Sequence, residues 1–213
     1  MLALLRDHYG HDLPTGGAPD PSICMHLDPS RSGETVAAMV AHLRPDRSRE
    51  LAVTAWTAFG SPCLSVFRPV YPFDLGLPPE LDRGHRRYDS ESPWWAFERL
   101  QRVVAQAPAL APVAREALGH LEAGFRAEAA RTEDETARLL EAGRRDEALA
   151  LLRTLVDSTG ERAVALARRL TVELEPRAVE LAVPAMVTAW AGPNEEAGVP
   201  LLTWSHNTSA ARR

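Results

Sequence analysis

The sequence predicts an α+β protein in which a part rich in strands is followed by a helical part. Strand-like apolar runs lie before residue 70 and are separated by turns rich in glycine and proline. After residue 92, apolar residues recur with the spacing of amphipathic helices. The 213 residues can bury one sizeable core. We therefore expect a single domain, 1–213, with strands and loops over 1–91, helices over 92–191 and an irregular tail over 192–213.

Antiparallel strands are expected between residues 22 and 68. Residues 22–27, 51–57 and 63–68 are short apolar runs, and the turn AFGSP between the last two favours a hairpin. Residues 34–43 are ambiguous, since their apolar residues fit a helical face slightly better than a strand. As a strand, this segment would be apolar on both faces, which is typical of a sheet covered on both sides.

The first helix is expected to begin at Ser92, which can act as an N-cap, with Pro93 at the first helical position. It follows a proline-rich loop over 69–91. Four further helices are expected, at about 110–130, 132–142, 145–175 and 178–191.

Local signals set the ends of those helices. The sequence TEDE, residues 132–135, has the pattern of a capping box, which predicts a new helix start at Thr132. Gly143 is expected to end that helix and Pro176 the next one. Pro184 predicts a kink or break in the last helix.

Composition excludes some classes of protein. The net charge of −5 gives no general attraction to nucleic acid or to an anionic membrane. The N-terminal residues lack the charged region of a signal peptide, and no apolar run is long enough for a membrane span. We therefore expect a cytoplasmic protein with no nucleic-acid or membrane partner.

The stretch SICMHLDPSRSG contains the residues most suggestive of chemistry. Cys24 and His26 would share one face of a strand, but neighbours two apart on a strand lie about 6.5–7 Å from each other. A packed core cysteine is the simpler reading of Cys24, and of Cys63 as well. A second group comprises Asp7, His8, His11 and Asp12. Its spacing matches no compact ligand signature, so neither a metal nor another cofactor is expected.

Four blocks of sequence carry a resemblance to a known family. They are ICMH (23–26), SRSGETVAAMVAHL (30–43), AWTAFGSPCLSVFRPVY (55–71) and SPWWAFERL (92–100). In order and spacing they resemble the C-terminal half of the secernin and dipeptidase family of N-terminal-nucleophile cysteine hydrolases. The resemblance implies two stacked antiparallel sheets between helix layers, of which this chain would supply a part, and it favours a strand for 34–43.

The resemblance also implies a reaction, the hydrolysis of amide bonds in dipeptides. The family's nucleophile is a cysteine at the mature N-terminus of the other half, whereas Cys24 lies in a block that matches a later segment. We therefore expect the chain to be inactive alone and to need a separate chain that carries the N-terminal half. Arg31 and His26 are the candidate oxyanion or substrate-pocket residues.

Two other interpretations stay open on the sequence alone. One is a non-catalytic binding or scaffold protein that uses its helical half. A third possibility is an enzyme that uses Cys24 directly as its nucleophile.

Overall fold

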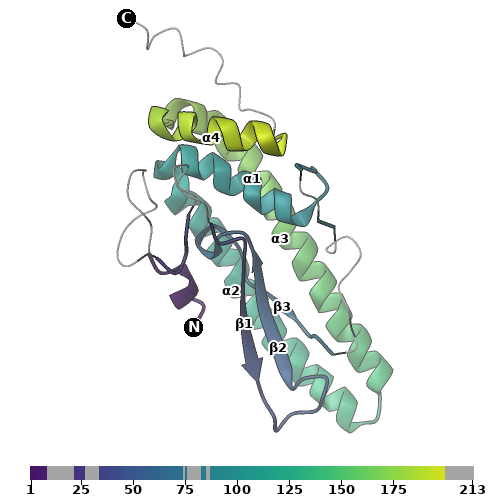
Figure 1. Ribbon diagram of the computed structural model, residues 1–213. Helices are drawn as coiled ribbons and strands as arrows, with labels where there is room; N and C mark the ends of the chain where they lie inside the picture. The colour runs from purple at the N-terminus through teal and green to yellow at the C-terminus, as the bar shows by residue number, and fades with distance from the viewer. Residues whose placement is uncertain (9–21, 27–33, 74, 76–82, 85–86, 200–213) are drawn as a thin grey trace, which may run out of the picture.

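The computed structural model describes residues 1–8, 22–26, 34–73, 75, 83–84 and 87–199. A three-stranded antiparallel sheet lies against the long helices α2 and α3, and helices α1 and α4 lie side by side across one end of these elements (Figure 1). The predicted α+β class is confirmed.

The sheet has the strand order β1-β2-β3, with β1 (Ala37–Leu43) at an edge. Strand β2 (Val53–Phe59) pairs with β1 along its whole length and with the short β3 (Arg68–Val70) on its other side. The strand favoured for the ambiguous segment 34–43 and the strand predicted over 51–57 are therefore confirmed. β2 pairs antiparallel with β3, but β3 begins only at Arg68, so the hairpin predicted between 51–57 and 63–68 is met at its last residue alone.

The strand predicted over 63–68 is wrong for most of its length, because a 3-10 helix, η2 (Pro62–Leu64), occupies its start. Proline lacks a backbone N–H and suits the first turn of a helix better than a ladder. All three residues of η2 are buried, so packing favours this compact turn over an extended chain.

The strand predicted over 22–27 is also wrong for residues 22–26, which form a bent segment; residue 27 lies outside the described residues. Its backbone hydrogen bonds go to two separate segments and not to one strand. The N–H of Cys24 donates to the carbonyl of Asp7, just after the short 3-10 helix η1 (Leu4–Arg6), and the N–H of Thr35 donates to the carbonyl of Met25.

Helix α1 (Pro93–Gln106) begins as predicted, and the hydroxyl of Ser92 accepts a hydrogen bond from the N–H of Trp95. Adjacent tryptophans point in different directions. Trp95 is buried, whereas the indole N–H of Trp94 donates to the carbonyl of Val36 at 2.9 Å, next to the start of β1. This bond ties the helix to the edge strand.

Helix α2 (Ala111–Glu141) follows the 3-10 turn η3 (Pro108–Leu110) and runs without interruption through residues 132–135. The predicted helix start at Thr132 is therefore wrong. Glu133 is held by hydrogen bonds from the sheet, so tertiary contacts favour continuation of the helix over the local capping signal. Gly143 does follow the end of α2, in the left-handed conformation at φ 71°.

Helix α3 (Arg145–Leu181) continues past Pro176, so the predicted stop there is wrong. Ala167, Leu170, Leu174 and Ala178 are all buried, and this continuous apolar stripe outweighs the one hydrogen bond that the proline removes. Helix α4 (Pro184–Ala197) begins at the proline that predicted a break, and it extends beyond residue 192, where an irregular tail was expected.

The core that positions the site lies between α1, α2, α3 and η2. Its buried residues include Cys24 and Cys63, so the bent segment 22–26 is part of the interior. Gly60 joins β2 to η2 with φ 69°, and a Cβ there would lie 2.3 Å from the amide of Gln101. Within the described part of the chain, no helix combines the length and apolar character that crossing a membrane requires.

Candidate functional site

Two histidines and two cysteines from three separate segments converge at one point. They are His8, Cys24, His26 and Cys63, and their potential ligand atoms all lie within 4.8 Å of one another. The Nε2 atom of His26 lies 3.1 Å from Nε2 of His8, 3.6 Å from Sγ of Cys24 and 3.2 Å from Sγ of Cys63. We call these four residues the Cys/His cluster.

Backbone hydrogen bonds fix two members of the cluster. The N–H of Cys24 donates to the carbonyl of Asp7 at 3.2 Å, which brings His8 beside the bent segment. The hydroxyl of Ser22 donates to the carbonyl of Cys24 at 2.8 Å. Met25, between the two ligands of this segment, exchanges two hydrogen bonds with Thr35, at 3.0 and 3.1 Å.

A buried ion pair holds the remaining parts of the cluster together. Arg6, two residues before His8, donates to the carbonyl of Pro62, next to Cys63, at 2.8 Å. The same guanidinium pairs with Glu122 of α2, whose carboxylate is almost fully buried and also accepts from the N–H of Phe67. The cluster is thus assembled on helix α2 through charge-assisted hydrogen bonds, which are stronger than neutral ones.

The two thiols differ in their ionisation. A hydrogen bond from the thiol of Cys24, together with those from His26 and His8, outweighs burial and lowers the pKa of Cys63 to about 2. The hydrogen bond to Cys63, together with burial and the charge of Cys63, raises the pKa of Cys24 above its ordinary value. Negative charge is therefore favoured on Cys63 over Cys24. Arg115 of α2 also favours negative charge on Cys24.

The structure brings together some of the residues that the sequence suggested and leaves others apart. His26 lies in the cluster and does not line the open cleft between α2 and the sheet, which is described below. Arg31 lies outside the described residues, as do His11 and Asp12 of the second group.

The full cluster was not apparent from the sequence. By sequence, His8 groups only with Asp7, His11 and Asp12, and Cys63 is predicted only as a buried thiol. His8 and Cys63 lie 18 and 37 positions from His26, so only the pair Cys24 and His26 gives a local signal.

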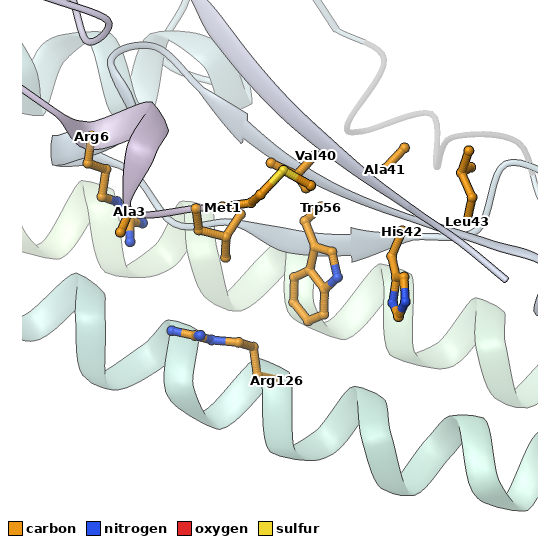
Figure 2. A pocket seen from close by; sticks show the side chains of 10 residues that line it. Met1, Ala3, Arg6, Val40, Ala41, His42, Leu43, Trp56 and Arg126 are labelled. Carbon is orange, nitrogen blue, oxygen red and sulfur yellow. The ribbon is translucent and has the colours of Figure 1, made fainter.

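An open cleft of about 900 Å³ lies between helix α2 and the sheet face that is turned toward it. In Figure 2, Trp56 and His42 point toward α2, where Arg126 lies, while Ala41 and Leu43 point the opposite way. The N-terminal residues Met1 and Ala3 border the cleft. The cleft is mostly apolar and separate from the Cys/His cluster.

The opposite face of β1 is apolar and exposed. We call Ala37, Met39, Ala41 and Leu43 the outer face of β1; each is exposed, and Met39 and Leu43 are 63% and 67% accessible. β1 is also an edge strand, so one side of its backbone is unpaired within the described sheet. On the other face of β1, Ala38 and Val40 are half-buried, so the two faces differ in exposure.

The burial of the Cys/His cluster limits its chemistry. Cys24 is completely buried and Cys63 is 6% exposed, so a substrate carbonyl has no access to either sulfur. Reactive cysteines are in general partly exposed. Thiolate sulfur and imidazole nitrogen are ligands for a soft or borderline metal ion, and this is the chemistry that the four residues share.

The N-terminal part of the molecule matches a known protein family. No curated protein and no solved structure matches the chain. The family model described as peptidase family C69 matches residues 4–116, which contain the cluster, the sheet and helix α1. This family includes the secernins and dipeptidases, so the resemblance to that family is confirmed. Because the match covers more than half of the chain, the protein belongs to peptidase family C69.

Proposed function

We propose that the chain takes part in the hydrolysis of peptide bonds in small peptides, as the C-terminal half of a dipeptidase-like C69 hydrolase. In this proposal the nucleophilic cysteine belongs to a separate chain that carries the N-terminal half. The observation that carries the proposal is the exposed apolar outer face of β1, in a chain that belongs to a peptidase family.

The position of the cysteines supports a nucleophile supplied from elsewhere. The chain has two cysteines, and both are buried in its core. Attack on a carbonyl needs a thiolate with free access to the substrate. In the proposed complex, a cysteine at the N-terminus of the other half attacks the carbonyl, its own α-amino group takes the proton, and an oxyanion hole stabilises the tetrahedral intermediate.

The outer face of β1 supports a missing sheet layer. Sheets that pack face to face interdigitate apolar side chains, and the exposed Met39 and Leu43 are suited to that contact. The helices α2 and α3 already cover the other side of the sheet. A second sheet on the outer face would complete the αββα sandwich that the resemblance implies, and would bury apolar groups that water now surrounds.

Of the two pocket residues that the resemblance suggested, the proposal retains Arg31 as a candidate for oxyanion or substrate binding. His26 is directed into the Cys/His cluster, where its Nε2 atom is already in contact with three other members. We therefore assign it no role toward the peptide.

The test is an assay of dipeptide hydrolysis with and without the missing half. The chain is purified alone, and also co-expressed with the polypeptide encoded directly upstream of its gene. We expect the co-purified pair to release free amino acids from dipeptides and the chain alone to release none. A thiol-alkylating reagent should abolish the activity of the pair.

Variants of the outer face test where the other half binds. Met39→Glu with Leu43→Glu should prevent co-purification, because two carboxylates would be buried without partners. Val172→Glu is the matched control, since Val172 is equally exposed but lies on α3, away from the sheet. Hydrolysis of dipeptides by the chain alone would contradict the proposal. Binding of partners through the helices, with no hydrolysis by the pair, would favour the non-catalytic alternative.

A further inference from the structure

We infer that His8, Cys24, His26 and Cys63 form a structural zinc site that fastens the N-terminal segment and residues 22–26 to the helical core. This inference does not depend on the proposed function. It rests on the geometry of the four ligand atoms, on their chemical type and on their burial.

The three separations measured from Nε2 of His26 fit a single zinc ion. Tetrahedral geometry with Zn–S of about 2.3 Å and Zn–N of about 2.0–2.1 Å places nitrogen atoms about 3.3 Å apart, and sulfur about 3.5 Å from nitrogen. The observed distances from Nε2 of His26 are 3.1 Å to His8, and 3.6 and 3.2 Å to Cys24 and Cys63. All three lie within about 0.3 Å of the values for a shared metal.

Hydrogen bonding alone does not account for these contacts. The Nε2 atom of a neutral imidazole carries either one proton or one lone pair. It can therefore satisfy one close polar neighbour well, whereas Nε2 of His26 has three within 3.6 Å. A cation at the centre of the cluster would bind all four lone pairs at once.

The ligand types select the metal. Two thiolates and two imidazoles are a common ligand set of structural zinc, whereas magnesium and calcium require oxygen ligands. Zinc with two thiolates is a neutral unit, which suits a site whose ligands are mostly shielded from water. Cys24 and Cys63 belong to the apolar core, and His8 is 9% exposed.

The number of protein ligands indicates the role of the metal. Catalytic zinc sites have three protein ligands and one position open to water or substrate, while structural sites have four. Here all four positions are filled by side chains from three segments: His8 after η1, the bent segment 22–26, and η2. The metal would therefore cross-link parts of the chain that share few regular hydrogen bonds.

The direct test is the metal content of the full chain. The protein is expressed in zinc-supplemented medium, purified without chelator under reducing conditions, and analysed by elemental mass spectrometry. We expect about one zinc per chain in the wild type. Cys24→Ser, Cys63→Ser, His8→Ala and His26→Ala should each lower zinc affinity by more than about 100-fold, beyond the loss seen when only a supporting residue is changed.

His120→Ala is the matched control. His120 is a strongly exposed histidine on α2 that lies beside Glu116, outside the cluster, and its replacement should leave one zinc bound. Equal zinc content in this variant and in the four ligand variants would overturn the inference.

A measurement on the wild type alone covers the case in which ligand variants fail to fold. Cobalt(II) added to the metal-free chain should give a thiolate-to-cobalt charge-transfer band and the intense visible bands of a tetrahedral complex, saturating at one equivalent. Zinc should then abolish both. Absence of these bands, or a disulfide between Cys24 and Cys63 in the protein as isolated under reducing conditions, would overturn the inference.

Discussion

Two polar clusters join the first seventy residues to the helical layer, and they differ in how they satisfy their charges. One contains Glu133 of α2, which pairs with Arg44 and accepts hydrogen bonds from the hydroxyls of Thr54 at 2.7 Å and Tyr71 at 2.9 Å. We call it the Glu133 network. The other is the Cys/His cluster, in which four side chains with metal-binding lone pairs meet.

The two clusters stabilise buried polar groups in different ways. The Glu133 network balances an anion with a cation and two hydroxyl donors, all from this chain. The Cys/His cluster brings together four side chains that can all donate lone pairs to a metal. We propose that a bound metal cation completes it. The two should therefore respond differently to chelators, to mutation and to pH.

Removal of metal should give the largest effect. A ligand that binds only the folded state stabilises it by about 4 kcal/mol at a thousandfold excess over its dissociation constant. For a chain of this size each kcal/mol moves Tm by about 2–4 °C, so chelation should lower Tm by about 8–16 °C. Thermal unfolding with and without chelator measures the shift. The Cys63→Ser variant should show no further fall, and an unchanged wild-type Tm would contradict the prediction.

Loss of Glu133 should come next in size and should not depend on metal. In Glu133→Ala, the guanidinium of Arg44 and the hydroxyls of Thr54 and Tyr71 lose their shared acceptor in a site that is mostly buried. We expect the free energy of unfolding to fall by about 3 kcal/mol in urea denaturation. Glu135→Ala is the control on the same helix, because its pair with Arg138 is exposed and contributes about 0.5 kcal/mol or less.

The Glu133 network should also depend on pH. Burial acts to raise the pKa of Glu133, but hydrogen bonds from Arg44, Thr54 and Tyr71 outweigh it, so the pKa is lowered overall. A lowered folded-state pKa stabilises the fold above the unfolded value of about 4.3 and loses that effect as pH falls through the folded value. Between pH 5 and 3 the wild type should lose about 1 kcal/mol more than Glu133→Gln. Equal losses in the two proteins would show that Glu133 does not titrate in this way.

How far the sequence predicts the molecule depends on the range of the interactions involved. The start of α1 is set by Ser92 and Pro93, which are local, and was predicted correctly. The helix start at Thr132 and the stop at Pro176 were also local signals, but contacts of Glu133 and of the stripe around Leu174 override them. Periodicity alone could not assign 34–43, because a strand with apolar residues on both faces also contains apolar residues at helical spacing.

The candidate site was less predictable than the fold. Cys24 and His26 are two residues apart, so their proximity is predictable from the sequence. Their contact with His8 and Cys63 depends on a bent segment where a strand was expected, and on a 3-10 turn inside another expected strand. A metal site of this kind has no spacing signature, because its ligands come together only after three segments have packed on α2.

The smallest expected effect is the coupling between the two clusters. Arg44 and Thr54 lie at one end of the β1–β2 pair, while Gly60 leads from the other end of β2 toward Cys63. Seven-residue strands of about 3.3 Å per residue place the clusters on the order of 20 Å apart. Separate sites at this distance contribute additively, within about 0.5 kcal/mol.

The coupling is measured as a cycle of four urea denaturations, in wild type and Glu133→Ala, each with zinc and with chelator. We expect the loss of stability on chelation to be the same in both proteins, within about 0.5 kcal/mol. A larger difference would mean that α2 transmits strain from one cluster to the other. Helix α2 contacts both regions through charged residues, Glu122 near η2 and Glu133 near Arg44. Such coupling would therefore mean that α2 moves as one rigid element. Additivity would instead show that the metal orders only the N-terminal segments around it.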